Sequence, residues 1–118
     1  DTTDTEYPKW ILAQGCFLRL ARSPGRLVSP HMRTVTLKKL MDMGYGERLC
    51  PSHDCICLHI HNEQADGSIA EQHDFHKSNP DQYLFMHRHV IPELQELGAT
   101  DRDIEMLFVD NPRRLFEA

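Results

Sequence analysis

Side chains that could bind a metal are concentrated in the middle of this 118-residue chain. Seven of the eight histidines lie between positions 53 and 89, and residues 52–61 read SHDCICLHIH. In an extended segment alternate side chains share one face. Thiolate and imidazole are ligands that zinc accepts, and four of them complete a tetrahedral site. One hypothesis is therefore a local zinc site formed by Cys55, Cys57, His59 and His61.

The spacing of this cluster also supports a different interpretation. C-x-C-x-H-x-H is not one of the common structural zinc patterns, and a straight strand spreads alternate side chains further than one ion can bridge. The alternative is a loop whose histidines face solvent. His87 and His89 form a second His-x-His pair, but they fall in a predicted helix, where residues two apart do not face each other. We interpret these two as surface or packing residues.

Asp54 and Arg22 are candidates for a different chemistry, because each follows a predicted strand. In a parallel barrel the active site lies at the carboxyl ends of the strands. A carboxylate at that position could bind a metal, accept a proton, or do both. The alternative for Asp54 is a residue that caps the next turn. Arg22 is a candidate contact for an anion or a carbonyl, and its alternative is a solvated surface arginine.

The first half of the chain predicts two successive helix–glycine–strand units. Each helix ends at a glycine, which adopts the left-handed conformation of a helix C-terminus without steric cost. This order is typical of an α/β fold with parallel strands. Two strands do not complete such a sheet. The predicted elements are a helix at 6–14, a strand at 16–20, a loop at 21–30, a helix at 33–43 and a strand at 48–53.

The second half predicts a long loop followed by helices. The loop predicted at 55–82 includes residues 62–82, which are polar and lack a clear period, and loops of that length usually serve a function. A helix over 83–97 contains Pro92, which should kink or divide it. Thr100 and Asp103 resemble a capping box that starts a helix over 101–108. A last helical turn should begin at Asn111-Pro112 and complete the terminal helices at 83–117.

Composition excludes several classes of function. Thirteen basic and 18 acidic residues give a formal net charge of −5, which disfavours binding to a nucleic-acid backbone. No apolar run approaches the roughly 20 residues of a membrane span, so we expect no membrane association. Three of the four cysteines lie within eight residues, which is poor spacing for a disulfide framework. A reduced, cytoplasmic protein is the expectation.

Four segments, in order, resemble the phosphotriesterase family of the amidohydrolases. The segment DTTD followed by EYPKWILAQGCFLRL resembles the stretch after a metal-binding histidine of that family. GYGERLCPSHD resembles the last barrel strand with its preceding Gly-Tyr turn. Residues 79–116 resemble the terminal helices, including the closing Asn-Pro-x-Arg. The resemblance runs from residue 1 to about residue 117.

This resemblance implies a (β/α)8 barrel with a binuclear metal centre, usually zinc, with other divalent metals as alternatives. Its members hydrolyse phosphotriesters or lactones, so a small-molecule ester or lactone would be the substrate. The 118 residues would be the C-terminal part, with the last two strands and their helices, because a whole barrel needs about 250 residues. The partner would be the remaining barrel segment or a second copy in a dimer or other homo-oligomer. Two alternatives are a non-catalytic module with the local Cys/His zinc site, and a degenerate, truncated relative that packs against a partner chain.

Few residue roles carry over from the family. Asp54 stands where the family has a metal-binding aspartate that accepts a proton from the bridging hydroxide. Arg22 stands at a position after strand seven that contacts substrate, and Ala21 replaces the aspartate that precedes it in many members. The loop after Asp54 would lie over the mouth of the barrel, where Ile56 and Leu58 could line an apolar leaving-group site. The family's other metal ligands have no counterpart in these 118 residues.

Overall fold

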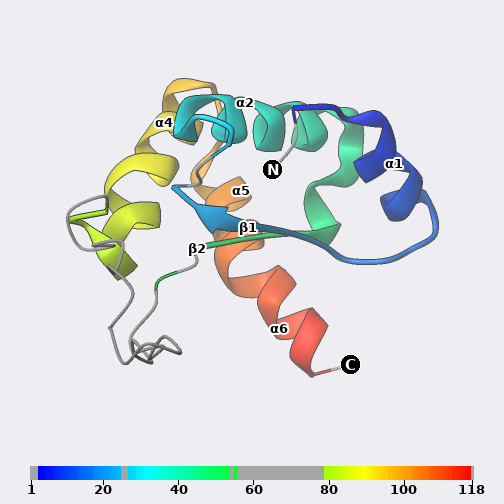
Figure 1. Ribbon diagram of the computed structural model, residues 1–118. Helices are drawn as coiled ribbons and strands as arrows, with labels where there is room; N and C mark the ends of the chain where they lie inside the picture. The colour runs from blue at the N-terminus through cyan, green and yellow to red at the C-terminus, as the bar shows by residue number, and fades with distance from the viewer. Residues whose placement is uncertain (1–2, 25–26, 54, 56–78, 118) are drawn as a thin grey trace, which may run out of the picture.

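The computed structural model describes residues 3–24, 27–53, 55 and 79–117. In this part of the chain two parallel strands, β1 (Leu18–Ser23) and β2 (Leu49–His53), form one sheet. Helix α2 (Pro30–Leu40) connects them, as expected for parallel strands that need a crossover. Figure 1 shows α2 running alongside the strand pair, with α1 (Glu6–Ala13) near one of its ends and α4 (Ile91–Glu96) near the other.

The first unit follows the predicted order, but its strand is displaced. Helix α1 ends before Gly15, whose φ of 80° is the left-handed conformation expected of it. Strand β1 spans Leu18–Ser23, not the predicted 16–20, and Ser23 pairs with His53 at the end of β2. The predicted loop at 21–30 is therefore wrong for its first three residues. The pairing of Ser23 with His53, 30 residues later in the chain, makes these residues part of β1.

The second unit starts earlier than predicted. Helix α2 begins at Pro30 and not at residue 33, because the Ser29 hydroxyl accepts a hydrogen bond from the Met32 N–H at 3.3 Å. Proline suits the first turn of a helix because the N–H it lacks would have no helical partner there. The helix ends at Leu40 and continues as the wider turn η1 (Met41–Tyr45), in which Gly44 has a φ of 88°.

The second strand confirms the prediction to within one residue. A short 3₁₀ turn, η2 (Gly46–Arg48), leads into β2. Pro51 lies inside β2 and is paired in register with Leu20. Proline is tolerated on an edge strand, where the missing N–H costs no ladder hydrogen bond on the inner side. Among the described residues β2 pairs with β1 alone.

The second half of the described chain is helical, as the sequence predicted for residues 83–117. The segment comprises η3 (Gln82–Leu84), the π turn η4 (Met86–Val90) and α4, so the helix predicted over 83–97 changes from a π turn to an α-helix just before Pro92. Thr100 and Asp103 form the predicted capping box at the start of α5 (Asp101–Glu105). The chain stays helical through η5 (Met106–Asp110) into α6 (Asn111–Phe116), so the helix predicted to end at 108 is longer than expected.

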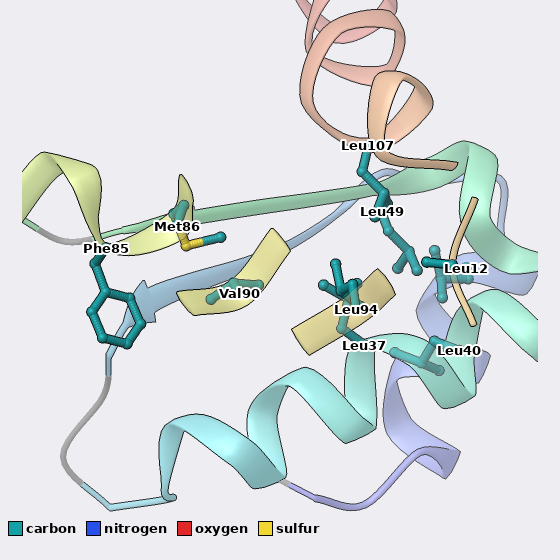
Figure 2. Close-up of a cluster of buried hydrophobic side chains, with 10 residues drawn as sticks. Leu12, Leu37, Leu40, Leu49, Phe85, Met86, Val90, Leu94 and Leu107 are labelled. Carbon is teal, nitrogen blue, oxygen red and sulfur yellow. The ribbon is translucent and has the colours of Figure 1, made fainter. Parts of the chain in front are cut away.

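A single apolar cluster joins both halves of the chain. Figure 2 shows Leu49 of β2 pointing toward Leu94 of α4 and Leu12 of α1. The buried apolar members are Leu12, Leu37, Leu40, Leu49, Phe85, Met86, Val90, Leu94, Ala99 and Leu107. This cluster packs the helices against the strand pair. No helix in the described part of the chain is long and apolar enough to cross a membrane.

Candidate functional site at the carboxyl ends of the strands

The carboxyl ends of β1 and β2 lie side by side but are not in simple register. Leu20 pairs with Pro51, and Ser23 pairs with His53. Two residues of β1, Ala21 and Arg22, therefore stand opposite the single residue between Pro51 and His53 of β2. Two residues opposite one is the arrangement that defines a β-bulge. β-Bulges are common near active sites, where they redirect a side chain.

Arg22 occupies the bulge with an unusual backbone conformation. Its φ is 70°, in the left-handed region that non-glycine residues rarely adopt. Such a conformation costs on the order of 1–3 kcal/mol and is found preferentially at functional sites. The side chain of Arg22 is exposed. Arg22 therefore lies within β1, at its carboxyl end, and not in the loop that the sequence predicted.

Polar and aromatic contacts link the strand ends to each other and to the helical segment. The Arg19 Nε–H donates to the Ser52 hydroxyl at 3.0 Å, across the strand pair. The ring of His53 packs edge-on against Tyr83, with the ring centroids 5.2 Å apart. Because Tyr83 lies in η3, the start of the helical second half is held against the end of β2.

The side chain of Arg33, on α2, contacts the bulge of β1. The Arg33 guanidinium donates through Nη2 to the backbone carbonyl of Ala21. Arg33 is half-buried, and burial lowers the pKa of its guanidinium from the usual value. It borders a cavity of about 190 Å³ beside β1, which Tyr7, Leu20 and Val90 also line. The contact between Arg33 and the Ala21 carbonyl could not be predicted from residue types and their spacing, because the partner is a backbone atom 12 residues away.

Most of the predicted site residues lie outside the described residues. These are Asp54, Ile56, Cys57, Leu58, His59 and His61. Cys55 is described and is half-buried. Within residues 3–24, 27–53, 55 and 79–117, no three His, Cys, Asp or Glu side chains are grouped closely enough to hold a metal ion. Both the Asp54 prediction and the local zinc site therefore stay predictions.

A cluster of charged residues at the start of the helical half was not predicted. Asp81 accepts hydrogen bonds from His89 and from Arg88, each at 2.5 Å. These two bonds hold the pKa of the Asp81 carboxyl below its usual value. His89 also stacks at a tilt on Phe85, with the ring centroids 4.7 Å apart. His89 is exposed and packs on Phe85, so the prediction that it is a surface or packing residue is confirmed.

Comparisons with known proteins establish the family. The chain matches the model of the phosphotriesterase family over residues 1–116. It is 30% identical over 120 residues to a phosphotriesterase homology protein of Mycobacterium tuberculosis, covering 99% of this chain and 34% of that protein. The chain therefore belongs to the phosphotriesterase family, and it spans about a third of the length of the relatives that it matches.

Solved structures agree with this assignment. The phosphotriesterase of Mycobacterium tuberculosis superposes with a TM-score of 0.79 and 29% identity, covering 98% of this chain and 34% of that one. The organophosphorus hydrolase of Deinococcus radiodurans superposes with a TM-score of 0.80 and 25% identity, over 98% and 34% respectively. The predicted α/β fold class, as part of a (β/α)8 barrel, is confirmed.

Proposed function

We propose that the protein containing this chain is a metal-dependent hydrolase of phosphotriesters or lactones. Family membership supports a hydrolase, and similar proteins are named as a phosphotriesterase and an organophosphorus hydrolase. The observation that carries the proposal is the bulged, left-handed Arg22 beside the end of β2. In a barrel this is the edge on which substrates bind, and Asp54 follows β2 directly in the sequence.

In this proposal Asp54 is both a metal ligand and the residue that accepts a proton. A carboxylate oxygen is a donor that zinc and similar divalent ions accept. A bound divalent ion supplies an activated water and polarises the substrate's phosphoryl or carbonyl oxygen. The family's other metal ligands have no counterpart in these 118 residues, so the remaining barrel segment is proposed to supply them.

Arg22 has the complementary role of binding the substrate. Its guanidinium carries a permanent positive charge and donates several hydrogen bonds, which suits a phosphoryl oxygen or a lactone carbonyl. Ile56 and Leu58 are proposed to line the apolar leaving-group pocket. The remaining barrel segment, or a second copy, is proposed as the partner that covers the sheet edges, and the cytoplasm as the compartment.

The test separates Asp54 from the neighbouring cysteines in the full-length protein. We expect Asp54→Asn to lower kcat/KM for a phosphotriester or a lactone by about 100-fold or more, the usual contribution of a general base. Cys55→Ser combined with Cys57→Ser is the matched control, with kcat/KM and bound zinc within about twofold of wild type. Loss of zinc in the cysteine variant with an unaffected Asp54→Asn would instead support the local zinc site. An intact but inactive full-length protein would support the degenerate relative.

A further inference from the structure

Arg33 is a half-buried, charged side chain on α2 that donates a hydrogen bond to the backbone of the bulge. We propose that Arg33 is a positioning residue, which holds the bulge of β1 and thereby sets the direction of Arg22. This inference rests on the proposed function, in which Arg22 binds the substrate. It assigns to α2 a part in substrate recognition that no feature of the sequence indicated.

The bulge interrupts the ladder between the two strands, so its backbone needs another interaction to keep its conformation. In a regular parallel ladder both strands advance one residue at a time, and successive side chains alternate between faces. Here Ala21 and Arg22 stand opposite one residue of β2, so the regular ladder is interrupted at this point. The Ala21 carbonyl belongs to the interrupted stretch, and the Arg33 guanidinium donates to it.

The first turn of α2 fixes Arg33 in place. The Arg33 backbone N–H donates to the Ser29 carbonyl at 3.1 Å, and the Thr34 hydroxyl donates to the Pro30 carbonyl at 3.1 Å. Thr34, the next residue along the helix, is 2% exposed, so α2 is buried on the Thr34 side. The planar guanidinium is pre-organised, so arginine loses less freedom per hydrogen bond than lysine does. The helix start and the strand end are therefore coupled through one side chain.

The coupling acts on Arg22 because Arg22 follows Ala21 directly. If the bulge relaxed to regular pairing, the register after Leu20 would shift by one residue. A shift of one residue moves a side chain to the other face of the sheet. Arg22 would then give up its left-handed conformation, and its guanidinium would no longer be directed as it is now. Arg33 needs no contact with the substrate to have this effect.

The experiment uses the full-length protein with Arg33→Met, Arg33→Lys and a control, Lys39→Met, at an exposed position of the same helix. Crystal structures report φ at residue 22, and steady-state kinetics report KM and kcat. For Arg33→Met we expect residue 22 to lose its positive φ. We also expect KM to rise about tenfold, as for loss of one contact to a charged group, with kcat within about threefold. Arg33→Lys keeps a positive charge and a single hydrogen-bond donor group. We therefore expect its KM to lie between the values of wild type and Arg33→Met.

A double-mutant cycle separates positioning from general stability. In an Arg22→Met background Arg33→Met should change KM by less than about twofold, because the group it positions is already absent. A full effect in that background, an unchanged KM, or a retained positive φ in Arg33→Met would each overturn the proposal. If wild type hydrolyses neither substrate, the proposed function fails, and φ at residue 22 alone decides whether Arg33 holds the bulge. If Arg33→Met does not fold, Arg33→Lys decides by the same readings.

Discussion

Asn111 shows how one residue fastens the end of the chain to the strand pair. Its side chain is fully buried and its amide donates to the carbonyls of Gly46 and Leu49, at 2.7 Å each. Its side-chain oxygen accepts a hydrogen bond from Arg114. The Asn-Pro-x-Arg motif therefore has a structural role, because Asn111 and Arg114 both donate hydrogen bonds to the turn that leads into β2.

We expect Asn111→Ala to lower the free energy of unfolding of the full-length protein by about 2–4 kcal/mol. The reason is that two buried carbonyls would lose their donor, and each unsatisfied group costs about 1–3 kcal/mol. Arg113→Ala, an exposed change on the same helix, is the control and should stay within about 0.5 kcal/mol. Urea unfolding measures both. Equal, small effects for the two variants would show that Asn111 does not hold the turn.

Gly44 is a position where the backbone itself limits the residue type. Its φ is 88°, and a Cβ built on it meets no atom within 4 Å, so conformation and not space is the constraint. We expect Gly44→Ala to cost about 1–2 kcal/mol of stability. Gly44→Asn should cost less, since asparagine tolerates this conformation better. The urea midpoints of the two variants provide the measurement, and alanine equal to asparagine would contradict the expectation.

Among the secondary-structure elements, the helical segments that contain Pro92 and Pro112 share one feature. Each widens into a π turn just before its proline, η4 before Pro92 and η5 before Pro112. Proline lacks the N–H for the preceding helical turn and its ring crowds the carbonyl four residues back. A wider turn gives room for both effects, so the chain stays helical across each proline.

The Asp81 cluster at the start of η3 predicts a pH dependence of stability. Hydrogen bonds from His89 and Arg88 lower the pKa of the Asp81 carboxyl in the folded protein. The stabilisation is therefore present above the ordinary value of 3.8 and is lost as the pH falls through the lowered folded value. We expect Asp81→Asn to be less stable than wild type at pH 5, and the gap to shrink below pH 3.8.

Urea midpoints measured from pH 5 down to acid test this dependence. Glu96→Gln removes an exposed carboxylate from α4 and is the matched control, for which we expect little difference at any pH. A gap between wild type and Asp81→Asn that stays constant through the acid range would show that ionised Asp81 is not the source of the stabilisation.

At the scale of the molecule, the described part of the chain leaves apolar surface exposed. Tyr7 and Trp10 on α1 are 63% and 61% exposed, and their rings stack on each other. Leu27 is 87% exposed. Each large apolar side chain left in water forgoes roughly 1.5–3 kcal/mol, a large part of a domain's total of about 5–15 kcal/mol. Both outer edges of the strand pair also remain free for pairing within the described residues.

We therefore expect residues 1–118, expressed alone, not to form a stable catalytic monomer. They should associate with further copies or require a complementary barrel segment, and they should show no hydrolysis with added zinc. Light scattering after size exclusion, thermal unfolding and assays with both substrate classes measure these properties. A dilute monomer with one cooperative transition and zinc-dependent turnover would contradict the whole expectation.

Features with a local cause could be predicted from the sequence. The capping box of Thr100 and Asp103 and the left-handed glycines at 15 and 44 each depend on a few neighbouring residues, so their patterns were sufficient. The helix–glycine–strand order predicted the α/β class, and the motifs of residues 1–20, 44–54 and 79–116 predicted the family. The roles of Asp54 and of the Cys/His cluster came from motif position and from residue types and spacing, and they stay predictions.

Tertiary structure decided the features whose partners lie far along the chain. Strand β1 continues to Ser23 because it pairs with His53, and its bulge at Arg22 follows from a register that no local pattern encodes. Arg33 reaches the Ala21 carbonyl only after α2 has folded back along the strands. The physical reason is that capping and backbone preference act within a turn, whereas register and long-range hydrogen bonds exist only once separate elements pack together.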